Sequence, residues 1–358
     1  MECTTKFNDF ISVISLTDSM KQELRTAYKD LKSKLNSNII SKDIITMFLQ
    51  GSYARHTGVR PISKDDKLDV DLVVVTRFDY RKMSPQQALK AVVPFLEENY
   101  KGKYRIQGRS IGIKLGKCSI DLVPTALPND TVQSFLSEAF NNTAYEESFF
   151  RADSTINAIK KYAKIDGDWK KEPLKIPDRD AGKWDDTHPI AQILWTQEMN
   201  DRTNGEYIHM VRAIKWWKKN YCKNSETIKS YPLEHFIGNC CSVGKDGLAT
   251  LITNTLNTMA SNSETVKPYL PDRGVPQHDV FGRVEDEDYK NFILTIRDIS
   301  IKAKDALQEQ DLYESSLKWR SIFGPCFPIY DKPKSDTDEP KFTKREDYSK
   351  PDKPSRYA

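Results

Sequence analysis

The feature that most limits how this chain can fold is an apolar run that begins with two carboxylates. The segment DKLDVDLVVVTRF places Asp69 and Asp71 on either side of Val70 and continues as an unbroken Val/Leu stretch. Such a stretch is typical of a mostly buried strand. Successive side chains of a strand point to opposite faces, so Asp69 and Asp71 are predicted to share one face while Val70 turns into the core. Two carboxylates therefore converge on one spot.

A third carboxylate, Asp121, lies in a second apolar run, CSIDLVPT. Gly116 and Lys117 separate this run from RSIGIKL, which is a hairpin signal, and an adjacent strand would bring Asp121 beside the first pair. Three clustered carboxylates repel one another unless cations neutralise them, and hard oxygen ligands suit Mg²⁺, with Mn²⁺ as the alternative. The pattern predicts a two-metal site at which one ion activates an attacking hydroxyl and the other binds a triphosphate.

Gly51 and Ser52 interrupt another apolar run, in DIITMFLQGSYARHTGVRP, ahead of the acidic strand. A glycine there allows backbone N–H groups to approach the β- and γ-phosphates, and the serine hydroxyl adds a donor. Arg55 and His56, just beyond, fit either a surface position or a phosphate contact. A Gly-Ser pair alone carries almost no information, and Asp-x-Asp alone is common on exposed loops. Their order, followed by a lone Asp, is what favours a two-metal phosphoryl-transfer site.

Helical spacing of apolar residues appears in several other segments. From Thr17 to Leu35 it predicts a long helix capped near Thr17 or Ser19, and residues 84–99 predict another. Residues 126–190 show no clear periodicity until PIAQILWTQEMN, and are expected to wrap the surface between two lobes. Four helical segments then follow within 206–310. The expected fold class is α+β, with a small mixed sheet and a helical second lobe.

Three parts are expected along the chain. Residues 1–205 would form a catalytic lobe with an N-terminal spine helix and connecting loops, and residues 206–330 a helical lobe. Residues 331–358 are polar, charged and rich in Lys, Asp and Pro. They have too few apolar groups to offset the entropy of ordering, so this tail is predicted to be disordered.

Composition excludes several classes of protein. No run is apolar for long enough to span a bilayer, and the start MECTTKFNDF has no basic and then apolar leader, so a cytoplasmic protein is expected. The net charge is only +4, which does not mark a protein that coats long nucleic acid. The cysteines lack metal-ligand spacing, so buried thiols are favoured over a zinc site at Cys240 and Cys241 with His235 or His209.

The order LQGSYARHTGVRP, DVDLVVV and IDLVPT resembles the catalytic core of the DNA polymerase β-type nucleotidyltransferases. The segment VRAIKWWKK is similar to the helix of 2′-5′ oligoadenylate synthases and cyclic GMP-AMP synthases in which an Arg and a Lys contact the donor triphosphate. These fall on Arg212 and Lys215. IKSYPLEHF resembles their Ser-Tyr pair, here Ser230 and Tyr231, in which the serine contacts phosphate and the ring stacks on the donor base. The alternatives are a solvated helix face for the first pair and packing for the second.

From about residue 7 to 330 the pattern is similar to the bacterial CD-NTases of anti-phage (CBASS) signalling, and most of all to their clade D, through MSPQQA, GRSIGI, THPIAQILWT and YPLEHFIGN. The resemblance implies a cage-like fold, Mg²⁺, ATP or GTP as substrates and a cyclic di- or trinucleotide product, with clade D suggesting an adenine-containing trinucleotide. It also implies a partner, either a HORMA-domain activator or a ubiquitin-activating-type enzyme that conjugates the tail. The chain lacks a zinc-thumb pattern and a strongly basic face, so long DNA is not expected as activator.

Two other kinds of function share parts of this pattern. Linear 2′-5′ oligoadenylate synthases, and adenylyltransferases that act on tRNA or small molecules, use the same Gly-Ser and aspartate order. A non-catalytic nucleotide- or RNA-binding module of the same fold is the third possibility. The intact set of acids argues against that module, because a binding protein has no need for three mutually repelling carboxylates. A cyclic oligonucleotide synthase is the leading hypothesis.

Overall fold

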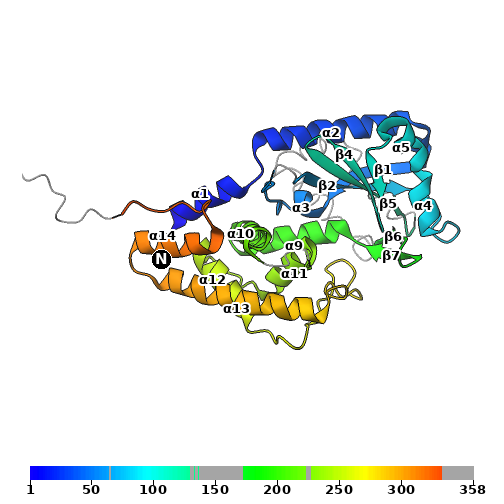
Figure 1. Cartoon of the computed structure of the whole chain (residues 1–358). Coiled ribbons are helices and arrows are strands. Elements are labelled where there is room, and N and C mark those ends of the chain that lie inside the picture. Colours follow the sequence, from blue (N-terminus) through cyan, green and yellow to red (C-terminus); the bar gives the residue numbers. More distant parts are fainter. Residues whose placement is uncertain (64–65, 130–132, 134–135, 137–171, 223–226, 333–358) are drawn as a thin grey trace, which may run out of the picture.

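A sheet lobe and a helical lobe lie next to each other, and the N-terminal segment runs across both (Figure 1). The structure, a computed structural model, describes residues 1–63, 66–129, 133, 136, 172–222 and 227–332. The tail predicted to be disordered lies outside these residues apart from its first two positions. Among the described residues, no helix has the length and apolar character that crossing a membrane requires. The predicted α+β class is confirmed.

The sheet is mixed, as predicted. Its strand order is β1-β2-β5-β4-β3, and a hairpin of β6 and β7 continues it from β5. Strands β2 and β5 run parallel, and the other pairs are antiparallel. The predicted hairpin around Gly116 and Lys117 joins β4 to β5. The strands are β1 (Ile44–Gln50), β2 (Leu68–Thr76), β3 (Tyr104–Ile106), β4 (Ile111–Leu115), β5 (Cys118–Ala126), β6 (Leu174–Asp178) and β7 (Lys183–Thr187).

The β6–β7 hairpin was not predicted. The expectation of an irregular connection up to residue 190 is therefore wrong at its end. Strand β7 has no buried face, since its side chains are exposed or half-buried, so it shows no apolar alternation in sequence. An ion pair between Lys175 and Asp186 joins the two strands instead, with 2.5 Å between Nζ and Oδ1. Charge pairing across strands leaves no periodic signal that a hydrophobic pattern can detect.

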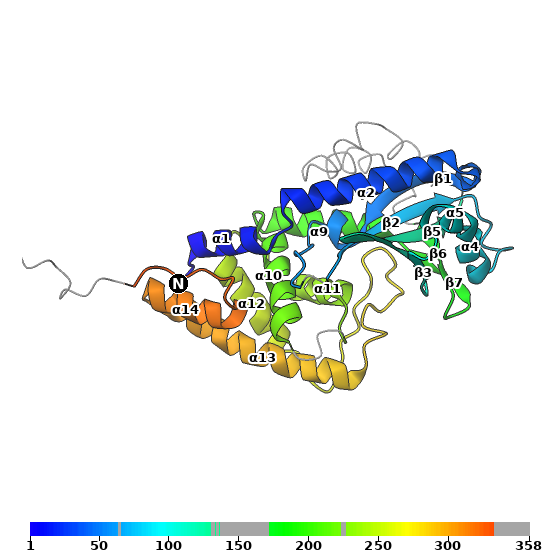
Figure 2. The same cartoon turned by 45° about the horizontal axis from the view of Figure 1, so that its top comes forward.

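Helix α2 (Asp18–Ser37) is the predicted spine helix and lies along the sheet in both views (Figures 1 and 2). It begins where predicted, because the Thr17 hydroxyl accepts a hydrogen bond from the Met20 N–H. The single helix predicted over residues 84–99 is instead two, α4 (Pro85–Ala91) and α5 (Val93–Tyr100). Pro94 lacks an N–H, and its ring disfavours a continuous helix at this position. The short α3 (Gly51–Ala54) follows β1 directly.

Within the described residues, the helical lobe contains the four predicted helices together with α1, α14 and α9, of which α9 also contributes Ile190 and Ile193 to the core of the sheet lobe. The N-terminal α1 packs into this lobe, although it precedes the sheet in sequence, through Phe7 and Phe10, which contact Trp319 and Phe323 respectively. Each lobe has its own hydrophobic core. The helices are α1 (Thr4–Ile14), α9 (Pro189–Arg202), α10 (Glu206–Tyr221), α11 (Ser230–Cys240), α12 (Leu248–Ala260), α13 (Asp286–Gln308) and α14 (Leu312–Phe323).

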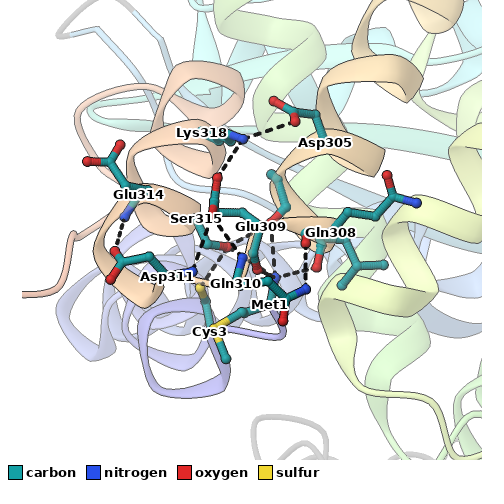
Figure 3. A network of polar contacts seen from close by, with 12 residues as sticks. Met1, Cys3, Asp305, Gln308, Glu309, Gln310, Asp311, Glu314, Ser315 and Lys318 are labelled. Carbon is teal, nitrogen blue, oxygen red and sulfur yellow. Dashed lines mark hydrogen bonds and ion pairs between the residues drawn. The ribbon is translucent and has the colours of Figure 1, made fainter.

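The amino group of Met1 fixes the start of α1 against the end of α13 (Figure 3). It donates to the carbonyl oxygens of Ala306 and Glu309, at 3.0 and 3.1 Å, and to that of Leu307. The last carbonyl groups of a helix have no partner within the helix and carry partial negative charge. A terminal ammonium group supplies hydrogen-bond donors to these carbonyl groups and a positive charge beside their partial negative charge. The contact therefore anchors α1 to the helical lobe.

A buried carboxylate, Asp178 at the end of β6, joins the two lobes on the side of the β6–β7 hairpin. Its Oδ2 accepts from Arg109 of the sheet lobe at 2.8 Å and from Arg283, just before α13, at 2.7 Å. Burial alone raises the pKa of a carboxyl group, but the Ala181 N–H and the two guanidinium groups outweigh it and hold the pKa of Asp178 at about 2.

This low pKa predicts that acid weakens the contact between the lobes. An unfolded Asp has a pKa of about 3.9, so the contribution of Asp178 is complete above about pH 4 and is lost as the pH falls towards 2. The free energy of unfolding of the wild type should therefore fall across this window. Asp178→Asn should lower stability at neutral pH and show a shallower fall between pH 4 and 2. The free energy of unfolding is measured by denaturant titration at several pH values. If it falls equally with pH in the two proteins, this assignment is contradicted.

Candidate active site

The three predicted carboxylates lie together in the first half of β2 and β5, two neighbouring strands inside the sheet. Strand β2 exposes Asp69, half-buries Asp71 and turns Val70 into the core, where it is 3% exposed. The parallel register of β2 and β5 then sets Asp71 directly beside Asp121. Because β5 also buries the neighbours of Asp121 on its opposite face, all three carboxylates share the polar face of the sheet.

The electrostatics of the cluster reflect this crowding. Burial, followed by the charges of Asp71 and Asp69, raises the pKa of Asp121 to about 6. Burial also raises the pKa of Asp71, against the opposing effect of the nearby Arg55 guanidinium. A hard divalent cation would relieve the repulsion, and carboxylate oxygens are the donors it prefers, so the residues fit such an ion. Within the described part of the chain, no three acidic, His or Cys side chains already stand at ligand spacing.

Two polar neighbours hold the outer carboxylates in this conformation. Asp69 accepts a hydrogen bond from the Ser119 hydroxyl, and Asp121 Oδ1 accepts from Gln107 Nε2 at 3.1 Å. Gly112 lies opposite Asp121 in β4, where a Cβ atom would lie 2.7 Å from Gln107 Nε2. Sequence reasoning missed Gln107, because an isolated glutamine before a strand has no distinguishing pattern.

The Gly-Ser turn packs directly against the cluster. Gly51 has a φ of +72°, which L side chains rarely adopt, and a Cβ atom there would lie 1.9 Å from Asp71 Oδ2. Only glycine therefore fits this position. Ser52 follows at the start of α3 and lines a cavity of about 360 Å³ together with Asp69.

The cavity lies between the lobes. Its helical wall includes Lys215 of α10 and Ser230 of α11, so the structure brings these two predicted residues together with Ser52 and Asp69. Four further lysines line it, and sequence reasoning did not single them out: Lys67, Lys218, Lys219 and Lys229. Lys219 pairs with Asp66, another lining residue, at 2.9 Å. The lysines give the cavity an excess of positive charge, which suits a polyphosphate.

Arg212 and Tyr231 do not line this cavity. Arg212 donates to the carbonyl oxygen of His56 at 2.8 Å and to the Ser15 hydroxyl at 3.2 Å. The Tyr231 hydroxyl donates to Asp272 Oδ2 at 2.6 Å. Tyr231 lines a separate, small cavity of about 10 Å³. The expected pairs are thus split: Lys215 and Ser230 line the lysine-lined cavity, whereas Arg212 and Tyr231 do not.

The zinc alternative gains no support from the placement of its residues. Cys240 is buried within the helical core, and Cys241 donates to the carbonyl oxygen of Ser242 at 3.1 Å. His209 pairs with Glu206, three residues earlier on α10, at 3.1 Å. These side chains form no metal-binding group within the part of the chain that the structure describes.

Comparison with known proteins gives the family. The family described as the Second Messenger Oligonucleotide or Dinucleotide Synthetase domain matches residues 1–154. A probable cyclic AMP-AMP-GMP nucleotide synthase of Salmonella paratyphi B is 38% identical, with 100% of each chain covered. A cyclic AMP-AMP-GMP synthase of Enterobacter hormaechei is 36% identical, with 92% of this chain and 93% of the relative covered. The chain belongs to the bacterial CD-NTase family. As a CD-NTase it is a nucleotidyltransferase and a cyclic oligonucleotide synthase.

The fold of this CD-NTase agrees with solved structures. That of E. coli MS115-1 CdnC in complex with HORMA superimposes with a TM-score of 0.64, covering 91% of this chain and 98% of the other. The sequence identity is 13%, so the likeness concerns the fold alone. It confirms the predicted nucleotidyltransferase architecture of a sheet lobe with a helical lobe.

The clash at the turn predicts that Gly51→Ala inactivates the CD-NTase. An added methyl group would displace the Asp71 carboxylate, and misplacing a reacting group by about 1 Å can cost about 100-fold in rate. Gly102→Ala is the matched control, since Gly102 has a φ of +71° but no atom within 4 Å of a Cβ. Both variants carry the same backbone strain. We expect kcat to fall about 100-fold in Gly51→Ala and to stay near wild type in Gly102→Ala. Similar kcat values in the two variants would show that contact with Asp71 is not what requires a glycine at position 51.

Proposed function

We propose that this CD-NTase condenses ATP and GTP into an adenine-containing cyclic trinucleotide that acts as a second messenger in anti-phage defence. The observation that carries the proposal is a cluster of three carboxylates, one of which, Asp69, lines a lysine-lined cavity between the lobes. The products in the names of its relatives, which contain AMP and GMP, support the choice of substrates. Each AMP or GMP unit would derive from a triphosphate with loss of pyrophosphate.

In this proposal Asp69, Asp71 and Asp121 are the catalytic residues and hold Mg²⁺, with Mn²⁺ as the alternative. Bound there, the metal would lower the pKa of the attacking hydroxyl and neutralise charge on the triphosphate. The clustered carboxylates and the raised pKa of Asp121 support a cation beside these residues of β2 and β5. The backbone at Gly51 and the hydroxyl of Ser52 would contact the β- and γ-phosphates, because α3 begins there and faces the cavity.

The helical wall would bind the rest of the triphosphate. Lys215 and Ser230 line the cavity and are proposed as phosphate contacts. Arg212 belongs to the nucleotide site through its contact with the His56 carbonyl group, which supports the segment after the Gly-Ser turn. Tyr231 would stack on a base only after its hydroxyl leaves Asp272, which holds it at 2.6 Å.

One incubation separates the candidate functions. The purified protein is mixed with all four nucleoside triphosphates and Mg²⁺, or Mn²⁺, and the products are treated with phosphatase and identified by mass spectrometry. A phosphatase-resistant trinucleotide containing adenine is expected. A phosphatase-sensitive product would instead indicate a linear oligoadenylate synthase. If no pyrophosphate is released, the protein is a binding module and the proposal fails.

The metal assignment predicts that Asp69→Asn with Asp71→Asn abolishes synthesis without unfolding the protein. Loss of an electrostatic stabiliser at a reacting centre commonly costs about 100- to 1,000-fold in rate. Removing two repelling charges should leave the melting temperature unchanged or raise it. Asp79→Asn is the control, because Asp79 lies on the exposed loop beyond the other end of β2. More than a few per cent of wild-type turnover in the double variant would disprove the assignment.

The tail is proposed as the point of attachment for a ubiquitin-activating-type partner. It lies outside the described residues, so the proposal depends on the sequence, in which the segment after Tyr330 is polar, charged and rich in Lys, Asp and Pro. A HORMA-domain activator is the alternative, supported by the HORMA complex of CdnC.

Truncation after Lys350 tests this attachment. The sheet and helical lobes end before the tail, so synthesis by the purified truncated protein should equal that of the full chain. Phage protection in cells should nevertheless be lost, as measured by plaque counts. Full protection by the truncated chain would rule conjugation out and leave the HORMA-type partner.

A further inference from the structure

One buried carboxylate joins the Gly-Ser turn to both helices of the cavity wall. Glu234 of α11 is 4% exposed. Its Oε2 accepts from Arg55 Nε at 3.0 Å and from the Thr57 hydroxyl at 2.9 Å, and its Oε1 accepts from Lys215 Nζ at 2.8 Å. Arg55 and Thr57 follow the turn in the sheet lobe, whereas Lys215 lies on α10.

The segment after the turn is held at each of three consecutive residues. Arg55 pairs with Glu234, the carbonyl group of His56 accepts from Arg212, and that of Thr57 accepts from Lys215 at 3.0 Å. These contacts bring together residues that are 156 to 179 positions apart. An isolated buried ion pair contributes little net stability, because desolvation opposes it. A network that engages both carboxylate oxygens specifies one arrangement of the parts that it joins.

That arrangement sets the width of the cavity. Ser230 lies one helical turn before Glu234 on α11 and lines the cavity from the helical side. Ser52 lies three residues before Arg55 and lines it from the sheet side. A shift of α11 relative to the turn would therefore change the separation of the two serines and of Lys215.

We propose that Glu234 is a positioning residue for nucleotide binding, which fixes the Gly-Ser turn against α10 and α11 so that both walls hold one triphosphate. The inference rests on the proposed function, because it takes the lysine-lined cavity as the nucleotide site. Glu234 itself does not line that cavity, and it acts through Lys215 and the segment that begins at Arg55. The low pKa of Glu234, about 2 despite its burial, is consistent with a carboxylate held charged by Arg55 and Lys215.

Asp178 provides a matched control for a purely structural role. It too is a buried carboxylate bound by two basic side chains, Arg109 and Arg283, and it too joins the lobes. It does not line the lysine-lined cavity. Glu234→Gln and Asp178→Asn each remove one buried negative charge while keeping the shape of the side chain. Both variants should therefore lose thermal stability.

The experiment compares these variants with the wild type in the full-length protein. The readouts are the melting temperature, the Kd for a non-hydrolysable ATP analogue, and KM and kcat for ATP. Glu234→Gln loses the charge-assisted contacts with Arg55 and Lys215. The Kd for the analogue and the KM for ATP should each rise about tenfold, with a smaller change in kcat. Asp178→Asn should keep the Kd for the analogue and the KM for ATP within about twofold of wild type. Glu234→Asp, which retains the charge, should recover part of the affinity.

A milder pair of variants covers the case in which Glu234→Gln does not fold. Thr57→Val removes only the hydroxyl contact, and Thr57→Ser retains it. The first should raise the Kd about threefold and the second should not. Unchanged analogue binding in Thr57→Val, or equal KM values in Glu234→Gln and Asp178→Asn, overturns the proposal. A wild type that binds the analogue but makes no cyclic product would refute the proposed function without refuting the role of Glu234.

Discussion

The mutual repulsion of three carboxylates is the constraint on which the rest of the structure depends. Asp69, Asp71 and Asp121 face the same way because β2 and β5 pair in parallel with Asp71 beside Asp121. The apolar residues between them bury the opposite face of both strands. The core thus stabilises an arrangement that the charges alone would oppose, and the site depends on cations to balance it.

Basic side chains from both lobes contribute to that balance, so neither lobe forms the site alone. Arg55 belongs to the sheet lobe and Lys215 to the helical lobe, and the charge of each favours the ionised form of Asp71. Glu234 holds both of them at fixed positions. The cavity is lined by Asp69 of the carboxylate cluster and by five lysines, four of them from the helical lobe. Its excess of positive charge suits a substrate with a polyphosphate chain.

Local pattern succeeded where the physical cause is local. The alternation around Val70 placed Asp69 and Asp71 on one face, and the cap at Thr17 set the start of α2. It failed at β7, where an ion pair replaces apolar burial. The motif resemblance predicts Arg212 and Tyr231 as nucleotide contacts. In the structure they do not line the lysine-lined cavity, and they donate to the His56 carbonyl group and to the Asp272 side chain.

The sequence by itself determined the order of a Gly-Ser pair and three aspartates, and the apolar pattern that buries the strands carrying those aspartates. The sequence is sufficient for this because the faces of a strand or helix follow from the spacing of residues that are close together in the chain. Only the tertiary structure decided which charges meet. Arg55 and Glu234 are 179 positions apart, and their pairing follows from how the two cores pack, which no local pattern encodes.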